Sequence, residues 1–573
     1  MKMNGAGIMV KSLEDLGVER VFGYTGAAIL PVFDALGESP IAITVNANEQ
    51  SCAFSAAGYS RAGDRTGVAV VTSGPAITNT LTAVADSHTD SIPLLVFAGQ
   101  VQQSRLGTDE FQHINVREVF AKAAKKVIQV TDPNRVEETV KDAWFYARSG
   151  KPGAVVIDFP LDIQRGEAEF RGLEVERYRL KYEQESHLGE NQCRRFFELL
   201  EKSRRPLLYI GGGVNSREAS RHIREFNRLF EIPSIISLMA KGVVDETLDT
   251  SLGMLGMFGT PGANTAIQET DLFVAFGVRW NDRVSQRVGE SGLEAEIAYI
   301  DINAEKVQEV RVTRNPKFSF IGDASTVLED LLDYARRHPV RLEIGQWRLK
   351  AAELKQRYRL DYNRAAKPIQ AAGVMELLSR RLTEETRITT GVGQHQMLAA
   401  QYLPMARPKS FLTAGAFGTM GFALSAAVGA HFADPAARTI AIDGDGSIKM
   451  NLGEIHTIGA LGLPIKVLLL NNHADGMVRT LQAAVYGRRF IATEREFDAD
   501  FSRIAAECGF AWHRKVRERE ELEGALDEFL EASGPCFLEV VTDREEGVFP
   551  FIPAGKGYRD MVLGPYIGKG GER

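Results

Sequence analysis

A buried-strand pattern that ends in a glycine-flanked aspartate decides the fold of this chain: Arg438-Thr439-Ile440-Ala441-Ile442-Asp443-Gly444-Asp445-Gly446-Ser447. The next apolar run along the chain, Lys466–Leu470, predicts a second strand, and it ends in Asn471-Asn472. Ligands bind at the carboxyl ends of parallel strands. We therefore expect Asp445 and Asn472 to lie at the same edge of one parallel sheet.

This edge has the chemistry of a magnesium-bound diphosphate site. Asp445 and Asn472 offer hard oxygen ligands, and Mg²⁺ takes one or two such ligands together with phosphate oxygens. Gly444 and Gly446 let backbone N–H groups approach a diphosphate, and the N-terminus of the following helix favours its negative charge. The alternative interpretation is a tight turn with a strand-end cap. That alternative is favoured for the glycine–aspartate–glycine triplet alone, whereas the spacing, the asparagine pair and the strand context together favour binding.

The same alternation of short apolar runs with helical patterns occurs in three parts of the 573-residue chain. It predicts an α/β fold of three doubly wound domains with parallel sheets, at residues 1–165, 190–360 and 371–573. Polar, poorly periodic stretches at about 164–190 and 360–371 are interpreted as linkers. The predicted strands are Arg20–Phe22, Ala42–Val45, Gly67–Thr72, Leu94–Ala98, Val127–Val130, Ala154–Asp158, Pro206–Ile210, Ser234–Ser237, Leu272–Phe276, Ile297–Ile302, Arg387–Thr390, Ser410–Thr413, Arg438–Ile442, Lys466–Leu470, His513–Val516 and Phe537–Val541.

The composition is that of an ordinary globular protein, with 44% hydrophobic and 25% charged residues. A net charge of -7 does not favour a nucleic-acid partner. The four cysteines are far apart and form no CxxC pair, so we expect a reducing compartment, the cytoplasm. The chain shows neither an apolar signal-peptide core nor a run of about 18 apolar residues, so no membrane partner is expected.

The Gly-Asp-Gly-Ser motif followed by Asn-Asn at this spacing resembles the diphosphate-anchoring motif of thiamine-diphosphate enzymes. Over nearly its whole length the chain is similar to the catalytic subunits of the acetolactate (acetohydroxyacid) synthase family. The order and number of the matching segments make this resemblance specific. They are Phe22-Gly23-Tyr24, Thr72-Ser73-Gly74-Pro75, Gly107-Thr108-Asp109-Glu110-Phe111-Gln112, Leu252-Gly253-Met254-Leu255-Gly256-Met257, Gly393-Gln394-His395-Gln396-Met397 and Gly418-Thr419-Met420-Gly421-Phe422.

The resemblance implies a domain that binds the pyrimidine ring of the cofactor, a central flavin-binding-like domain and a diphosphate-binding domain. It implies thiamine diphosphate, Mg²⁺ and a structural FAD as cofactors, and 2-oxo acids as substrates. The implied catalytic residues are Glu49, Gln112, Lys125 and Arg283. The implied contacts to thiamine diphosphate are Glu49, Gly393, Gln394, His395, Gly418, Met420, Gly444, Asp445, Gly446, Ser447, Asn472, Gly476 and Met477, and those to FAD are Gly212, Gly213, Arg279 and Asp301. The implied magnesium ligands are Asp445, Asn472 and the backbone carbonyl of Ala474.

Some of these residues have plain structural alternatives. Glu49 also fits an acidic residue at a helix start, Met420 a core methionine, and Arg283 a surface arginine paired with an acid. Lys125 fits a solvated lysine about equally well, because its flanking residues match the family poorly. In the family the cofactor lies between the first domain of one subunit and the third domain of another. The resemblance therefore implies a homodimer or homotetramer, with a possible regulatory subunit.

Four departures from the family pattern concern the substrate side. Ala27 follows Thr25-Gly26 where the family has Pro-Gly-Gly, Leu481 stands where a tryptophan is expected, Phe258 replaces a histidine and Asp475 replaces a glutamine. The leading hypothesis is an acetolactate synthase of branched-chain amino acid biosynthesis, because Arg283 matches an arginine that in the family holds the carboxylate of the second 2-oxo acid. Leu481, Phe258 and Ala27 instead motivate a different acceptor. The alternatives are a carboligase or decarboxylase that uses another acceptor, such as a bulkier ketone, a pyruvate oxidase-like flavin oxidoreductase, and a non-catalytic cofactor-binding protein.

Overall fold

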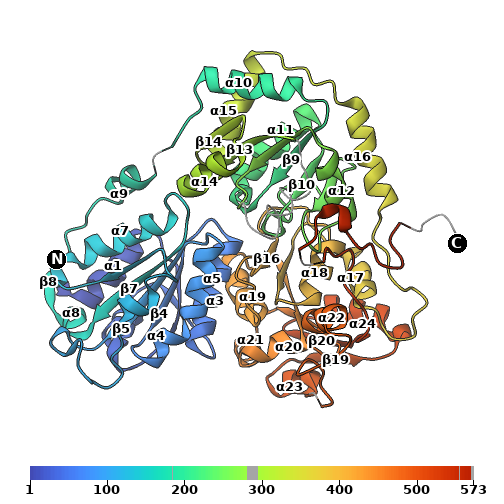
Figure 1. The fold of residues 1–573 in the computed structure, drawn as a ribbon. Coiled ribbons are helices and arrows are strands. Elements are labelled where there is room, and N and C mark those ends of the chain that lie inside the picture. The colour runs from blue at the N-terminus through green and yellow to red at the C-terminus, as the bar shows by residue number, and fades with distance from the viewer. Residues whose placement is uncertain (184, 280–294, 498, 554, 569–573) are drawn as a thin grey trace.

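The computed structural model describes residues 1–183, 185–279, 295–497, 499–553 and 555–568. It contains three α/β lobes that follow one another along the chain, coloured blue, green and orange in Figure 1. Each lobe is built on a six-stranded sheet whose neighbouring strands are all parallel, with helices packed on the sheet faces. The predicted α/β class with three doubly wound sheets is thereby confirmed. None of the described helices is long and apolar enough to cross a membrane.

The first sheet has the strand order β3-β2-β4-β5-β7-β6. Its strands consist almost wholly of buried apolar residues at the centre, as expected for a sheet covered on both faces. The strands are β2 Arg20–Tyr24, β3 Ala42–Val45, β4 Gly67–Val71, β5 Leu94–Gln100, β6 Lys126–Gln129 and β7 Ala154–Pro160. The helices are α1 Gly5–Asp15, α2 Leu30–Gly37, α3 Glu49–Ala62, α4 Pro75–Asn79, α5 Leu81–Thr89, α6 Val116–Phe120, α7 Val136–Arg148 and α8 Leu161–Arg165.

The central sheet has the order β11-β10-β9-β12-β13-β14, which is 3-2-1-4-5-6 in chain sequence. Sheets of this order bind dinucleotides at the crevice where the strand order reverses, here between β9 and β12. The strands are β9 Pro206–Ile210, β10 Ser234–Ile236, β11 Ser251–Met254, β12 Leu272–Phe276, β13 Glu296–Asp301 and β14 Phe318–Ile321. The helices are α10 Glu190–Lys202, α11 Arg217–Phe230, α12 Pro261–Glu269, α14 Ala304–Arg314, α15 Ala324–Arg337 and α16 Gly345–Arg357.

The third sheet has the order β16-β15-β17-β18-β20-β19. The first and third sheets therefore share the order 2-1-3-4-6-5, which agrees with an old duplication. The strands are β15 Thr386–Thr390, β16 Phe411–Thr413, β17 Arg438–Gly444, β18 Lys466–Asn471, β19 Trp512–Val516 and β20 Cys536–Val541. The helices are α17 Ala371–Ser379, α18 Gln394–Tyr402, α19 Phe422–Ala433, α20 Asp445–Ile448, α21 Glu454–Ala460, α22 Gly476–Val485, α23 Phe501–Glu507 and α24 Arg519–Glu531.

The sequence prediction needs correction in two places. It missed strands β11 and β14 of the central sheet. It also treated residues 164–190 as a plain linker, but that stretch contains strand β8 (Glu167–Glu169), which pairs antiparallel with β1 (Lys2–Asn4), and helix α9 (Val175–Tyr182). Helix α9 docks because Tyr178 is buried and stacks on Phe145 of α7, with ring centroids 6.5 Å apart.

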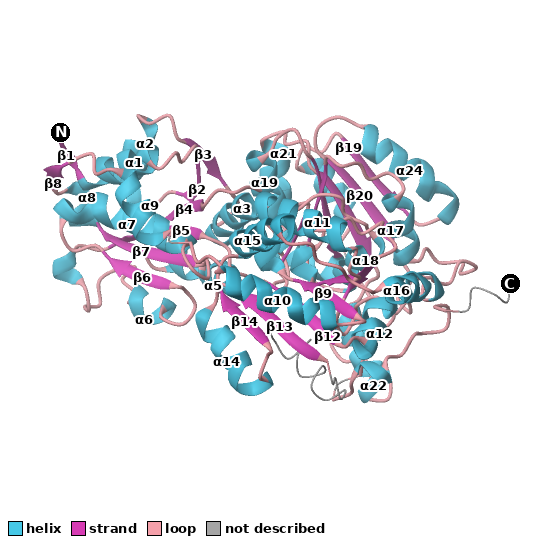
Figure 2. Ribbon diagram, turned by 90° about the horizontal axis from the view of Figure 1, so that it is seen from above, coloured by secondary structure: helices cyan, strands magenta, loops and turns pink. Residues whose placement is uncertain are grey.

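Helices α3 and α19 join the first domain to the third, and both Figure 1 and Figure 2 show them side by side between the two sheets. Their backbones touch because glycine removes the side chain at two crossing points. A Cβ added at Gly58 would lie 2.4 Å from the Ala426 carbonyl oxygen, and one at Gly429 would lie 1.8 Å from that of Ser55. This close packing fixes the N-terminal end of α3, and thus Glu49, against the third domain.

Candidate active site

The carboxyl ends of three adjacent strands meet at one edge of the third sheet. Strand β15 leads into Gly393, strand β17 ends next to Asp445, and strand β18 ends next to Asn472. The structure thus brings Asp445 and Asn472 to one sheet edge, as the spacing of the motif predicts. Asp445 is the first residue of helix α20 and is buried.

Three glycines allow the loops at this edge to approach one another closely. A Cβ at Gly444 would lie 2.6 Å from His395 Nδ1, and a Cβ at Gly476 would lie 2.0 Å from Gln394 Oε1. A Cβ at Gly446 would lie 2.2 Å from the Asp475 carboxylate. A side chain at any of these three positions, which together we call the cradle, would collide with a neighbouring loop. Glycine therefore lets the loops meet at the edge where the motif predicts a diphosphate.

The predicted magnesium ligands fit a hard divalent cation by their chemistry. The side-chain oxygen of Asn472 accepts a hydrogen bond from Ala474 N–H at 3.1 Å, and its amide donates to Gln394 Oε1 at 3.0 Å. Asn472 is therefore oriented with its oxygen toward the 472–474 turn. Among the described residues, no three His, Cys, Asp or Glu side chains form a metal-binding group. A magnesium site here would therefore combine Asp445 with the side chain of Asn472 and the backbone carbonyl of Ala474.

Arg495 gives the Asp445 carboxylate a positively charged partner that the sequence analysis did not foresee. Its guanidinium donates to Asp445 Oδ2 at 2.7 Å and to Asp475 Oδ1 at 2.5 Å. The charge of the buried Asp445 carboxylate is thus compensated by the guanidinium of Arg495. No local pattern could have revealed this contact, because it joins residues 50 positions apart.

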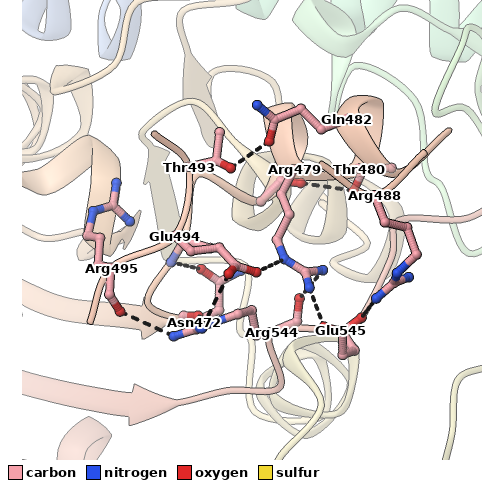
Figure 3. A network of polar contacts seen from close by, with 12 residues as sticks. Asn472, Arg479, Thr480, Gln482, Arg488, Thr493, Glu494, Arg495, Arg544 and Glu545 are labelled. Atoms are coloured by element: carbon pink, nitrogen blue, oxygen red, sulfur yellow. Dashed lines mark hydrogen bonds and ion pairs between the residues drawn. The ribbon is translucent and has the colours of Figure 1, made fainter. Parts of the chain in front are cut away.

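A network of arginine and glutamate side chains holds the segment that follows the metal loop (Figure 3). Arg479 of α22 donates to Glu494 at 2.7 Å and also pairs with Glu545. Arg488 pairs with the other oxygen of Glu545 at 3.0 Å, and Thr493 donates to Gln482 at 2.6 Å. The network fixes α22 and the returning chain beside Asn472. The sequence did not predict this network; from this segment only Gly476, Met477 and Leu481 were singled out.

His395 and Asp443 are buried beneath the cradle. Burial lowers the pKa of His395 to about 3, so its imidazole is neutral at physiological pH. Burial likewise raises the pKa of Asp443 to about 7, although the Ser447 hydroxyl and Gly444 N–H favour the charged form. The Nε2 atom of His395 lies 3.4 Å from Asp443 without hydrogen-bond geometry.

The segment that carries the predicted cofactor contacts Gly418 and Met420 is tied to the same loop. Gly421 N–H donates to the Ser447 hydroxyl at 2.9 Å, and Gly421 takes φ +83° directly before helix α19. Met420 precedes it and is half-buried. Gly418 also has positive φ, at +74°, with open space around its Cα. Met420 thus lies next to the diphosphate cradle.

The first domain contributes a separate group of predicted residues. Glu49 begins α3, which Asn48 caps by accepting from Ser51 N–H, and the Glu49 carboxylate accepts from Asn79 at 2.9 Å. Gly74, at the start of α4, lies against Gln112, since a Cβ there would be 2.9 Å from Gln112 Cβ. Helix α4 therefore lies between the two residues, with Gln112 near its first residue and Glu49 near its last.

Lys125 lies elsewhere in the first domain. Its ammonium donates to the carbonyl oxygens of Tyr146 and Ser149, both at 2.6 Å, at the C-terminal end of α7. Burial, together with Lys151, lowers its pKa to about 8. These contacts describe a helix-capping lysine, and its predicted place at the reaction centre stays a prediction. Arg283 and the segment Trp280–Asp282 lie outside the described residues.

A cavity of about 550 Å³ opens at the carboxyl ends of the central strands, bordered also by the first and third domains. Its walls include the four residues predicted to hold FAD, namely Gly212, Gly213, Arg279 and Asp301. A Cβ at Gly213 would lie 2.8 Å from Gly277 Cα, so the loops that contain Gly213 and Gly277 can approach this closely only because these residues are glycine. The cavity lies where a sheet of this strand order binds a dinucleotide, and its residues fit a flavin dinucleotide.

Comparison with known proteins defines the class. Residues 3–119, 193–331 and 391–540 match the family models described as the N-terminal TPP binding, central, and C-terminal TPP binding domains of thiamine pyrophosphate enzymes. This is a thiamine-diphosphate-dependent enzyme, with Mg²⁺ and FAD as the usual partners in its family.

Full-length relatives narrow the class. The chain is 35% identical over 560 residues to the acetolactate synthase isozyme 2 large subunit of Escherichia coli, covering 98% of this chain and 99% of that one. It is 36% identical to chloroplastic acetolactate synthases of Brassica napus and Zea mays, covering 97% and 98% of this chain and 86% and 88% of theirs. The chain therefore belongs to the acetolactate synthase family.

Proposed function

We propose that this enzyme converts two molecules of pyruvate into 2-acetolactate and carbon dioxide. The observation that carries the proposal is that the cradle of Gly444, Gly446 and Gly476 stands beside Asp445 and Asn472, on a chain that also presents Glu49. This donor set suits Mg²⁺ and a diphosphate, and Glu49 suits the other end of the cofactor.

Each residue then has a defined task. Asp445, Asn472 and the Ala474 carbonyl would hold Mg²⁺, and the backbone at Gly444 and Gly446 would face the diphosphate. Thiamine diphosphate, when bound, supplies the electron sink that decarboxylation of a 2-oxo acid needs. Glu49 would hold the proton shared with a nitrogen of the pyrimidine ring, and Gln112 would line the reaction centre.

The arrangement of the two groups favours an assembly of at least two copies. Glu49 is engaged by Asn79 within the first domain, whereas Asp445 is engaged by Arg495 within the third. A homodimer in which the first domain of one copy faces the third domain of the other would complete both sites at once. A regulatory partner is proposed by analogy with the relatives whose printed names call them large subunits.

The acceptor substrate is the part of the proposal that concerns the departures from the family pattern. Leu481 projects from α22 with 55% of its surface exposed, and it stands where the family pattern has a tryptophan. Phe258 lines the flavin cavity, and its carbonyl accepts from Gln401 at 2.9 Å. A smaller side chain at position 481 leaves room for a bulkier carbonyl acceptor, so larger ketones belong in the assay beside pyruvate.

The flavin is proposed to be structural, and the cytoplasm is proposed as the compartment. All four cysteines are free thiols, three of them buried, which suits a reducing environment. A redox role for the flavin would require oxygen uptake coupled to pyruvate loss, which an oxygen electrode detects. The chemistry proposed here predicts none.

The proposal is tested by incubating the purified protein with pyruvate, thiamine diphosphate, Mg²⁺ and FAD, and converting the product to acetoin with acid. We expect acetolactate, and we expect its loss when thiamine diphosphate or Mg²⁺ is omitted. Release of carbon dioxide without acetolactate, while another carbonyl compound forms an adduct, would replace pyruvate by that compound as the acceptor.

A further inference from the structure

A short antiparallel pairing places Arg495 beside the metal loop. Asp475 N–H donates to the Thr493 carbonyl at 2.8 Å, and Arg495 N–H donates to the His473 carbonyl at 2.9 Å. Arg544 clamps both segments, since its guanidinium donates to the carbonyls of Asn472 and Arg495, each at 3.3 Å (Figure 3). The backbone of residue 495 is therefore held in register with residues 472–475.

The Arg495 side chain spans two carboxylates from this fixed backbone. Its two terminal nitrogens reach Asp445 Oδ2 at 2.7 Å and Asp475 Oδ1 at 2.5 Å. The Arg495 and Asp445 side chains are 18% and 3% exposed, so solvent screens this pair only weakly. Gly446 makes the space, because a Cβ there would lie 2.9 Å from the guanidinium.

The guanidinium thus occupies the position of a cation at the carboxylate that the proposed magnesium site uses. A divalent ion would share Asp445 with Arg495, whose positive charge and charge-assisted hydrogen bond to Oδ2 oppose its entry. The second hydrogen bond, to Asp475, holds the guanidinium in place. Without the arginine, the buried Asp445 would face the partly exposed Asp475 as a pair of like charges. Such a pair attracts a divalent cation strongly.

We propose that Arg495 is a resident counter-ion that competes with the divalent metal for Asp445, so that metal loading is an exchange of cations and not a simple addition. This inference rests on the proposed magnesium site and concerns a residue of this chain that acts on that site. Arg495 is in this sense a positioning residue. It keeps the Asp445 carboxylate in place before the metal arrives and lowers the affinity for the metal alone.

The test is binding of Mn²⁺ to the cofactor-free protein, followed by the electron paramagnetic resonance signal of free Mn²⁺. Arg495→Leu should bind Mn²⁺ at least about tenfold more tightly than the parent protein, since the positive charge and the hydrogen bond that oppose its entry are gone. Arg495→Lys keeps one positive charge but cannot span both carboxylates, so its affinity should lie between the two. Arg503→Leu, an exposed arginine on α23, serves as the matched control and should leave the affinity unchanged.

Thermal unfolding gives a second readout that does not depend on catalysis. In a chelator, Arg495→Leu should unfold at a lower temperature than the parent protein, and added Mn²⁺ should raise its midpoint more than it raises that of the parent. Arg495→Lys provides the same comparison if the leucine variant does not fold. Asp445→Asn should abolish the tight Mn²⁺ binding of Arg495→Leu.

Equal or weaker Mn²⁺ binding by folded Arg495→Leu would overturn the exchange, and so would tight binding that survives Asp445→Asn. Either result is compatible with formation of acetolactate by the parent protein. Failure of this inference is therefore distinguishable from failure of the proposed function.

Discussion

The Glu49 carboxylate accepts a hydrogen bond from Asn79 Nδ2 at 2.9 Å, at the point where helices α3 and α4 of the first domain begin and end. The interaction orients the half-buried carboxyl group of Glu49. The buried packing of α3 on α19 fixes the helix that carries this acid. Glu49 is therefore held in a fixed position beside the face where the first domain packs on the third.

Replacing Glu49 by Gln keeps the size of the side chain and removes its ability to exchange a proton with the cofactor. We expect acetolactate formation to fall by about 10² to 10⁴, the usual contribution of a positioned acid or base. The thermal unfolding midpoint should change little, since Asn79 can still donate to the amide oxygen. Activity within a fewfold of the parent protein would remove Glu49 from the mechanism.

Mixing two inactive variants tests whether the site forms between copies. Glu49→Gln and Asp445→Asn homodimers should each be inactive, whereas a hybrid dimer has one intact site and one doubly altered site. Random reassembly should therefore restore about a quarter of the parent activity. Mixtures that stay inactive after verified subunit exchange would place Glu49 and Asp445 of a single chain in the same site.

Gly213→Val should empty the flavin cavity. Any Cβ at this position lies 2.8 Å from Gly277 Cα, so the two glycine loops must separate and the wall of the cavity shifts. We expect the FAD content after removal of free flavin, read from its visible absorbance, to fall by at least about tenfold. Gly524→Ala is the control, because it has open space on helix α24, and it should retain flavin.

Asp158 gives a pH dependence whose sign can be stated in advance. Burial in strand β7 raises its pKa to about 6, although Gln129 donates to the carboxylate at 2.7 Å. Between pH 3.8 and 6 the folded state therefore holds a proton that the unfolded state has released, so this group lowers the free energy of unfolding as pH rises. The free energy of unfolding falls by on the order of 3 kcal/mol in total, and this fall is complete above the pKa that Asp158 has in the folded state.

Asp158→Asn should remove that loss, because an amide resembles the protonated acid. The unfolding midpoint of the variant should exceed that of the parent by an amount that grows from pH 4 to pH 6 and then stays constant. Asp132→Asn should behave oppositely, since the exposed Asp132 has a lowered pKa through hydrogen bonds from Asn134, and its benefit is present above pH 3.8. A pH-independent difference for Asp158→Asn would contradict the assignment.

Leu481→Trp should shift the choice of acceptor. In the family that this chain resembles, the tryptophan expected at this position favours 2-oxobutanoate as acceptor, and the substitution restores it on the exposed face of α22. In a competition between pyruvate and 2-oxobutanoate we expect the ratio of 2-aceto-2-hydroxybutanoate to acetolactate to rise several-fold. Leu180→Trp, an exposed leucine on α9, should leave the ratio unchanged.

The central strands of the sheets were predictable because they are buried on both faces and are nearly continuous apolar runs. Leu272–Phe276 and Pro206–Ile210 agree with the structure at both ends. Strand β11 escaped because Gly253 interrupts it at φ +88°, and β14 because only Phe318 of its four residues is buried. Helix α9 was hidden in a strongly charged stretch.

The part of the site that stands at strand ends was predictable from the sequence. Asp445 and Asn472 stand directly after strands, so topology alone brings them to one edge. Arg495 and Arg479 reach the same place from a returning loop, and nothing in the neighbouring sequence indicates where their side chains point. The substrate-binding role of Arg283 likewise remains a prediction.

Carbon dioxide released from carboxyl-labelled pyruvate, counted against acetolactate formed in the same tube, tests the proposed reaction most directly. Two three-carbon acids that give one five-carbon acid must lose one carbon dioxide, so the account predicts equal molar amounts of the two products. Carbon dioxide in large excess would show a decarboxylase or an enzyme that uses another acceptor. Absence of both products with all three cofactors present would contradict pyruvate as the donor.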